Sequence, residues 1–288
     1  MKSFFLLVLF GFFSASVHAQ GNVTDELKFY DYLLQNKLMH DAALQYNLII
    51  KSPDVSIAQN DSLNYLTGWN LYQQKLLDTS IVHFLKVNAS SPYYLKSRFF
   101  SAYNLSYLHR LDTALFILNG IQQTGMQGFA QLLNLQKAGI ALLNSDGLAF
   151  EAASKKFDGS YFATAKEEEK LKTLNLALKT EKKKSPLAAA LLSSIIPGLG
   201  KIYAGRTGEG VISFVQVSAL GCIAVESLNK SGVKSGRFII TASLFSLFYI
   251  GNIWGSYFTV SVEKNERRNE IYNAVLFNMH IPLRTVFN

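Results

Sequence analysis

Residues 185–206 read SPLAAALLSSIIPGLGKIYAGR and open the most hydrophobic part of the chain. Within this stretch, Leu187 to Ile196 is an uncharged run of ten residues that ends at Pro197. A transmembrane helix needs about 20 apolar residues, so the run is half as long as a span. Two structures are therefore open: a kinked helix that continues to Tyr203 and crosses the membrane, or a re-entrant segment that enters the membrane and returns.

Two longer apolar segments follow this run. The first, from Val211 to Val225, is uncharged and extends to about Leu228, and the second, from Phe238 to Val262, has 25 residues without a charge. Both are long enough to cross a bilayer. We therefore predict a transmembrane module over residues 185–262, followed by a C-terminal helix or tail over residues 263–288.

The number of spans decides on which side of the membrane the C-terminus lies. Three spans place Lys201, Arg206 and the cations that follow Val262 on the side opposite to the preceding domain. Two spans return the C-terminus to the side of that domain and leave Lys230, Lys234 and Arg237 on the other side. Neither distribution follows the positive-inside rule cleanly. We prefer three spans and leave two open.

The first nineteen residues have the three parts of a secretory signal peptide. Lys2 provides a positive start, Phe4 to Phe13 is almost entirely apolar, and Val17-His18-Ala19 supplies a cleavage site before Gln20. The apolar run is too short to span hydrocarbon, which favours cleavage over an uncleaved anchor helix. The sequence thus predicts a signal peptide over residues 1–19 and a mature chain that begins outside the cytoplasm.

Residues 20–162 show helical periodicity with a recurring pair of positions. A small residue is followed four places later by a bulky one, and the small residues are 38, 34 and 39 positions apart. The pairs are Ala42 and Tyr46, Ser80 and Phe84, Ala114 and Leu118, and Ala153 and Phe157. Short turns with Asp41, Asp78 and Asp112 precede the first three pairs, and we expect these carboxylates to cap the helices that follow. The pattern predicts helical hairpins, with an irregular helical bundle as the alternative.

This region resembles the tetratricopeptide repeat, which has a period of about 34 residues and a small–aromatic–proline signature. The second unit fits best, with Gly68 in its first helix, Ser80 and Phe84 in its second, and Pro92 at its end. The third unit lacks the aromatic residue and the proline. The resemblance implies stacked helical hairpins that bind a peptide or a protein. The expected fold class is therefore all-α, with such hairpins followed by a helical transmembrane module.

A charged segment over residues 163–184 joins the two regions. Leu171, Leu174 and Leu178 keep helical spacing, so one face of a linker helix can pack on the last hairpin. The cluster from Lys182 to Lys184 immediately precedes the apolar region. We interpret it as a solvated helix end at the membrane boundary or as a contact with anionic headgroups.

The start of the apolar region carries a second resemblance. Its glycine-rich part is similar to the P-G-x-G-x-x-Y-x-G element of bacterial membrane proteins related to the TM2-domain group, and the matching residues are Pro197, Gly198, Gly200, Tyr203 and Gly205. The segment GNIWGSY, residues 251–257, resembles a further element of tetratricopeptide-containing envelope proteins in that group. The resemblance implies two hydrophobic segments around a glycine-rich turn and implies no biochemical activity.

These glycines have a physical interpretation. Glycine permits a tight turn and a close approach of two backbones, and Tyr203 is suited to the membrane interface. Gly251 and Gly255 form a G-x-x-x-G pair, which we expect to let a neighbouring helix come near, more within the module than in a dimer.

The composition argues against several kinds of function. A single cysteine, Cys222, excludes an internal disulfide and a multi-cysteine metal site, and the five histidines are isolated in sequence. Gly198 to Ile202 lacks the spacing of a P-loop. The net charge of +8 has no nucleic-acid-binding fold beside it. Only Glu226 lies near a span, which argues against ion-coupled transport. We expect no enzyme activity, no cofactor, no metal and no nucleic-acid partner.

The sequence therefore favours a scaffold or adaptor in the inner membrane of a bacterial cell envelope, with its repeats in the periplasm. Its expected partners are the lipid bilayer and a protein or peptide that the repeats bind. The alternative is a component of a small membrane channel, insertion or lipid-handling system in which the repeats act as a receptor.

Overall fold

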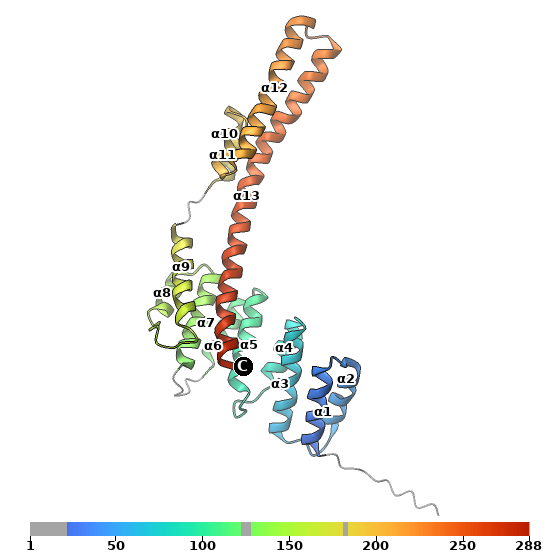
Figure 1. Ribbon diagram of the computed structural model, residues 1–288, viewed down its shortest axis with the longest axis vertical. Coiled ribbons are helices and arrows are strands. Elements are labelled where there is room, and N and C mark those ends of the chain that lie inside the picture. Colours follow the sequence, from blue (N-terminus) through green and yellow to red (C-terminus); the bar gives the residue numbers. More distant parts are fainter. Residues whose placement is uncertain (1–21, 122–127, 181–183, 288) are drawn as a thin grey trace, which may run out of the picture. The chain divides into compact units, whose positions relative to one another are not determined.

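The computed structural model describes residues 22–121, 128–180 and 184–287 (Figure 1). These residues form helices and no strands, so the prediction of an all-α fold is confirmed. The predicted signal peptide, residues 1–19, and Lys182 and Lys183 lie outside the described residues. The chain divides into two compact units, one up to Leu105 and one from Ser106 onward.

The first eight helices form four consecutive hairpins, and a ninth helix follows. Their bounds are α1 (Val23–Gln35), α2 (Met39–Lys51), α3 (Ile57–Gln73), α4 (Leu77–Leu85), α5 (Tyr94–Tyr107), α6 (Leu111–Asn119), α7 (Phe129–Leu143), α8 (Gly147–Ser154) and α9 (Ala165–Thr180). The division into two units falls within the last turn of α5.

The same three-residue turn joins the two helices of every hairpin. Its middle residue has a positive φ in all four turns, at Lys37, Lys75, His109 and Ser145. In the second turn, Leu76 N–H donates to the Leu71 carbonyl at 2.9 Å, which satisfies a carbonyl that the helix end leaves free. This repeated left-handed C-terminal cap sets the position at which the chain reverses direction in each hairpin.

The predicted aspartate caps are wrong for the first three turns. The N-cap residues are Leu38, Leu76 and Arg110, and none of them makes a side-chain cap hydrogen bond. The aspartates lie within the first turn of α2, α4 and α6 instead, where a negative charge interacts favourably with the helix dipole.

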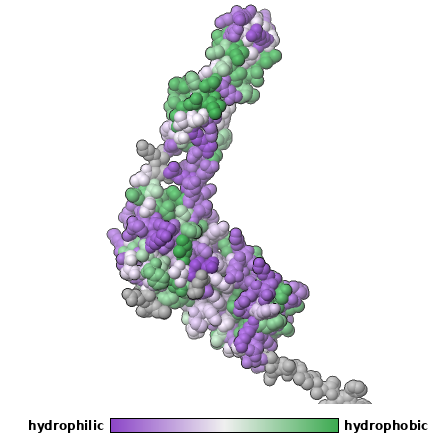
Figure 2. Space-filling model, viewed as in Figure 1, coloured by the Kyte–Doolittle hydropathy of each residue, from purple (hydrophilic) through white to green (hydrophobic). Residues whose placement is uncertain are grey.

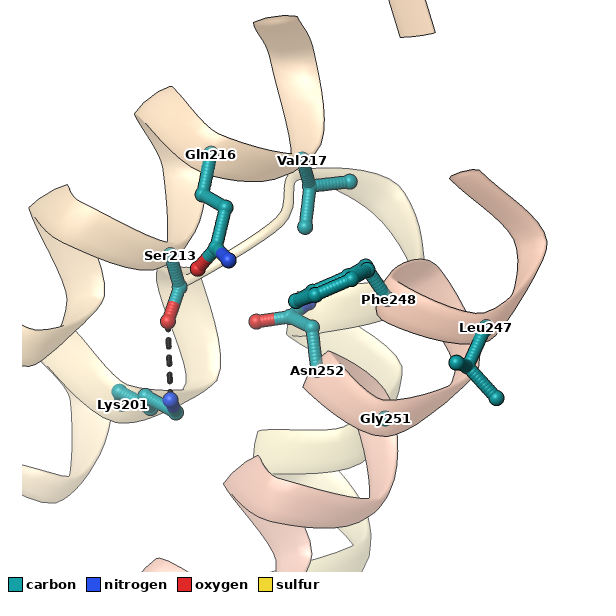
Figure 3. Close-up of a pocket in the computed structure, with 8 residues that line it drawn as sticks. All are labelled: Lys201, Ser213, Gln216, Val217, Leu247, Phe248, Gly251 and Asn252. Carbon is teal, nitrogen blue, oxygen red and sulfur yellow. Dashed lines mark hydrogen bonds between the residues drawn. The ribbon is translucent and has the colours of Figure 1, made fainter. Parts of the chain in front are cut away.

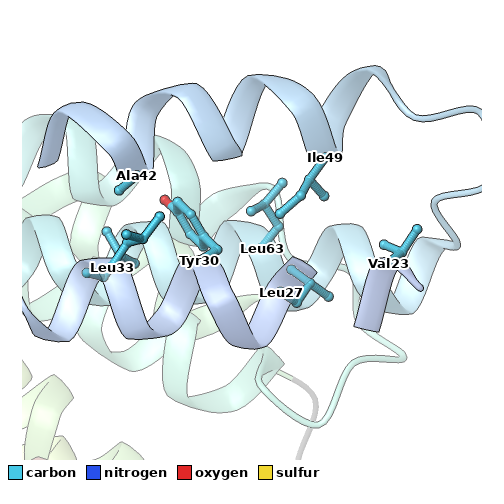
Figure 4. Packing of buried hydrophobic residues seen from close by; sticks show 8 residues of the cluster. Val23, Leu27, Tyr30, Leu33, Ala42, Ile49 and Leu63 are labelled. Carbon is cyan, nitrogen blue, oxygen red and sulfur yellow. The ribbon is translucent and has the colours of Figure 1, made fainter. Parts of the chain in front are cut away.

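The first unit buries an apolar core between α1, α2 and α3. Figure 4 shows its side chains, and the buried cluster consists of Val23, Leu27, Tyr30, Leu33, Leu34, Ala42, Ile49 and Leu63. The Tyr30 hydroxyl lies 2.8 Å from Thr67 Oγ1, so the polar end of this buried ring is satisfied. The core explains why α1 and α3 pack together although they belong to different hairpins.

The second unit contains α13 (Gly236–Phe287), a helix of 52 residues. The predicted domain boundary after residue 262 therefore falls inside one helix. Its last turns bury Val275, Leu276, Met279 and Leu283, a helical stripe that packs on α7 and α9. Gln136 Nε2 of α7 donates to the Met279 carbonyl at 2.7 Å. The C-terminal segment is thus part of the core of the second unit.

Two helices are long and apolar enough to cross a membrane among the described residues: α12 (Thr207–Ser231) and α13. The first apolar segment, which the preferred three-span topology needs as a span, forms α10 (Pro186–Ile195), a shorter apolar helix, and the short α11 (Leu199–Ala204). Figure 2 shows hydrophobic residues on the surface of α10, α12 and the N-terminal half of α13. Such a surface is suited to lipid and indicates membrane association.

Candidate functional site

α10 and α11 form a hairpin whose two ends lie side by side. Lys184 Nζ, just before α10, donates to the Ala204 carbonyl at the end of α11, at 2.6 Å. Ser185 N–H donates to the Tyr203 hydroxyl at 3.2 Å. The chain therefore returns to the level at which it started. The chain thus turns back after α10, as in the re-entrant alternative, and does not continue as one kinked helix to Tyr203.

Side chains of α13 satisfy the backbone at the tip of this hairpin. Gly198 N–H donates to Asn252 Oδ1 at 3.0 Å, and Asn252 Nδ2 donates to the Ser193 carbonyl at 3.4 Å. The Tyr249 hydroxyl donates to the Ser194 carbonyl at 2.5 Å. Backbone that leaves the helical pattern inside a membrane is tolerated only where protein groups bond to it. Asn252 and Tyr249 therefore provide hydrogen-bond partners for the backbone groups of this turn.

The tip of the hairpin lies beside the apolar part of α13. Asn252 lies eleven residues before Glu263, which forms an ion pair with Arg206 near the start of α12. Eleven helical residues rise about 16 Å, so Asn252 lies about that far along α13 from the ion pair.

Glycines allow the hairpin to pack closely, as predicted for Gly198 and Gly200. A Cβ on Gly200 would lie 2.0 Å from the Ala189 carbonyl oxygen, and one on Gly198 would lie 2.0 Å from the Gly210 carbonyl oxygen. Gly198 and Gly205 also have positive φ angles of 83° and 107°. No other residue type fits these positions without displacing backbone.

The close helix approach expected at Gly251 and Gly255 is wrong within this chain. A Cβ on Gly251 would meet nothing within 4 Å in the described structure, and one on Gly255 would meet only Lys201 Cε, at 3.7 Å. Gly251 instead leaves open a pocket between α11, α12 and α13.

This pocket has a volume of about 320 Å³, and Figure 3 shows its lining. The lining residues are Lys201, Ser213, Gln216, Val217, Leu247, Phe248, Gly251 and Asn252. Lys201 Nζ donates to Ser213 Oγ at 2.8 Å. Ser213 lies six residues into α12, about 9 Å along the helix from its first residue. The ammonium group therefore lies about two turns along α12 from the end of the module that carries Arg206 and Glu263.

Lys201 differs from Arg206 and Lys230 in its surroundings. Arg206 pairs with Glu209, Glu263 and Glu266 at 3.1, 2.7 and 3.7 Å, and Lys230 pairs with Glu226 at 2.7 Å. None of the carboxylates in the described ranges forms an ion pair with Lys201. The sequence predicts a glycine-rich turn or a kinked helix around this lysine and no separate helix, because α11 has only six residues.

A second concave site lies in the second unit between α6, α7 and α8. It is a groove of about 400 Å³ whose polar lining consists of Asp112, Asn119, Asn134, Lys137, Asn144, Asp146 and Lys156. Burial, and to a smaller extent Lys156, lowers the pKa of Lys137. An anionic group in the groove would relieve this unfavourable environment.

The residues of the repeat signature have packing roles. Ser80 Oγ donates to the Gly68 carbonyl at 2.8 Å, and a Cβ on Gly68 would lie 2.7 Å from the Phe84 ring. Ala42, Ala114 and Leu118 are also buried, Tyr46 is half-buried, and Pro92 lies in the turn before α5. None of these eight residues lines the groove or the Lys201 pocket.

No family model, no curated protein and no solved structure matches this chain.

Proposed function

We propose that this protein is a membrane-anchored scaffold or adaptor that binds a protein or peptide in the groove between α6, α7 and α8. The proposed location is the inner membrane of a bacterial envelope, with the helical hairpins on the periplasmic side. The observation that carries the proposal is the continuity of α13, which belongs both to the apolar module and to the core beside the groove.

α7 links the anchor to the groove. Its residues Asn134, Lys137 and Asn144 line the groove, whereas Gln136 and Gly139 face α13. A Cβ on Gly139 would lie 2.4 Å from Met279 Sδ, so the two helices are in intimate contact. A partner bound to α7 would therefore be held at the membrane through α13.

The same contact supports a two-span topology. If α12 and α13 both cross the bilayer, the C-terminal part of α13 returns to the side of the hairpins, on which it packs. Only the turn between α12 and α13, with Lys234 and the nearby Lys230 and Arg237, then lies on the opposite side. Lys201, Arg206 and the cations after Val262 then lie on the side of the hairpins, so the proposed topology rests on the α7–α13 contact and not on the positive-inside rule.

The chemistry of the groove suits an extended peptide that carries a carboxylate. Asn119, Asn134 and Asn144 offer side-chain amides, which both donate to and accept from a peptide backbone. Lys137 has a lowered pKa and no ion-pair partner among the residues described, so a carboxylate of the ligand would find a desolvated cation there.

Site-specific photo-crosslinking in cells tests this function. A photoreactive residue at Asn134 should give an adduct with one protein partner. The adduct should disappear when Lys137→Glu is added and persist with Lys155→Glu, since Lys155 is exposed on the same unit and does not line the groove.

An adduct that is insensitive to Lys137→Glu would contradict binding in the groove. Ion conductance by the purified chain in liposomes, without a crosslinked partner, would instead support the channel alternative.

A further inference from the structure

The pocket beside the re-entrant hairpin places a cation among residues of two apolar helices. The Lys201 ammonium group has one neutral partner, Ser213, and no carboxylate partner in the parts of the chain that the structure describes. A charge inside a membrane is costly unless an opposite charge or a strong set of hydrogen bonds compensates it. The chemistry of the site therefore favours an anionic ligand.

The walls of the pocket indicate where that anion comes from. Leu247 and Phe248 line it on α13 and are exposed, Leu247 by 69%, on the surface that would face lipid. On the polar side, the exposed Gln216 amide faces the same space as Lys201 (Figure 3). The pocket thus has a cationic, hydrogen-bonding part that continues into an apolar surface. That combination matches an amphiphile with an anionic head.

We propose that this pocket binds the anionic headgroup of a membrane lipid. Lys201 and Ser213 hold a phosphate or carboxylate oxygen, Gln216 donates a further hydrogen bond, and the beginning of the acyl chain lies against Leu247 and Phe248. The volume of about 320 Å³ holds a headgroup and not a whole lipid, so the chains stay in the bilayer. Gly251 keeps the space open, which gives this glycine a role other than helix packing. The site is independent of the groove between α6, α7 and α8.

The test uses the full chain in nanodiscs of phosphatidylcholine that contain a minor fraction of phosphatidylglycerol or, separately, of oleate. Native mass spectrometry then counts the lipids that stay bound after release from the disc. Wild type should retain phosphatidylglycerol in preference to phosphatidylcholine. Lys201→Met should lower this retention by about tenfold or more, since it removes a charge-assisted hydrogen bond. Lys234→Met, which removes a cation at the turn between α12 and α13, should leave retention unchanged.

A second variant separates loss of binding from loss of folding. Gly251→Leu keeps Lys201 and fills open space, so the variant should melt like wild type and yet lose the lipid. Retention of oleate as well would identify a carboxylate as an equally good ligand and would support the proposal.

Equal retention by wild type and Lys201→Met would overturn the proposal, as would full retention by Gly251→Leu. Displacement of the lipid by inorganic phosphate would overturn it by assigning the site to a soluble anion. A bound acidic polypeptide in place of lipid would assign it to a partner helix.

Discussion

The helical hairpins and the membrane module are both built from α-helices, but they bury different kinds of side chain. The hairpins bury large apolar side chains, such as Phe84, Phe99 and Phe100, each exposed by 1% or less. The module buries small and polar side chains, which include Ser193, Ser213, Ser227, Asn252 and Ser256, and exposes large apolar ones. Both regions are helical and both are close-packed, yet their insides differ in chemistry.

The difference follows from the solvent of each region. In water, burying an apolar side chain is favourable, by about 25 cal/mol per Å². In lipid, burial of a leucine gains little, because the surroundings are already apolar, and helices associate through small residues and hydrogen bonds. The Ser193 and Ser256 hydroxyls, 2.7 Å apart, and the Asn252 contacts with the α10–α11 turn are bonds of this kind.

The largest expected effect comes from a matched pair of phenylalanines. Phe84→Ala should destabilise the protein by about 3–5 kcal/mol, because Phe84 is fully buried and its loss leaves a cavity. Phe258→Ala should change stability by less than about 0.5 kcal/mol, since Phe258 is 55% exposed on the lipid-facing surface. Denaturation followed by circular dichroism in detergent measures both. Similar losses in the two variants would break the contrast between the regions.

Two glycines of the module should differ in the same experiment. Gly200→Leu should cost at least about 1–3 kcal/mol and deplete membrane-integrated protein, because its Cβ would collide with the Ala189 carbonyl. Gly251→Leu and Leu244→Phe should integrate normally, since Gly251 faces open space and Leu244 is exposed. The yield of each variant in the membrane fraction gives the answer. Normal accumulation of Gly200→Leu would show that the hairpin does not pack closely.

A third variant tests whether polar contacts hold the module together. Asn252→Leu removes the acceptor for Gly198 N–H and the donor for the Ser193 carbonyl, which should cost about 1–3 kcal/mol. The apparent melting temperature in detergent should fall, whereas Ser243→Ala, at an exposed position of the same helix, should leave it unchanged. An Asn252→Leu protein as stable as wild type would mean that apolar packing is sufficient in the module.

The smallest expected effect is a dependence of stability on pH that arises outside the module, because the module has no histidine. Burial, with a smaller contribution from Lys86, lowers the pKa of His83 below its usual value of 6.5. His83 therefore takes up a proton more readily in the unfolded chain than in the folded chain. Its contribution to the free energy of unfolding is present above pH 6.5 and is lost as the pH falls below that value. Melting temperatures should fall with acidification, and less so in His83→Gln. If His40→Gln, an exposed position, reduces the effect as much, His83 is not its source.

Helix period and apolar length made the hairpins and the two long apolar segments predictable. Ala42, Ser80 and Ala114 mark real packing positions, because all three side chains are buried and Ser80 bonds to the Gly68 carbonyl of the neighbouring helix. The predicted turns, which contain Asp41, Asp78 and Asp112, come a few residues after the observed turns in the chain. A left-handed cap at Lys37, Lys75, His109 and Ser145 uses ordinary residues in place of the glycine that would have marked it.

The candidate site was less accessible to sequence reasoning. Gly198 and Gly200 were identified because glycine carries a steric signal, but Lys201 was considered only in the count of charges on each side of the membrane, and Gly251 was assigned to a helix contact. Their pocket forms only when α11 folds back against α12 and α13, and that juxtaposition depends on Asn252, a residue without a sequence signal of its own. The docking of the C-terminal segment was missed for a similar reason, since its apolar stripe from Val275 to Leu283 does not identify its partner.

The central claim is that α13 returns to the side of the hairpins, and cysteine accessibility tests it most directly. In a Cys222→Ser background, single cysteines are placed at Asp54 in the hairpins, at Lys234 in the turn between α12 and α13, and at Arg284 near the end of α13, all of which are exposed. A membrane-impermeant maleimide is then added to intact spheroplasts and to permeabilised ones. The account predicts that positions 54 and 284 react in intact spheroplasts and that position 234 reacts only after permeabilisation. Protection of position 284 while position 54 reacts would place the two on opposite sides of the membrane and contradict the account.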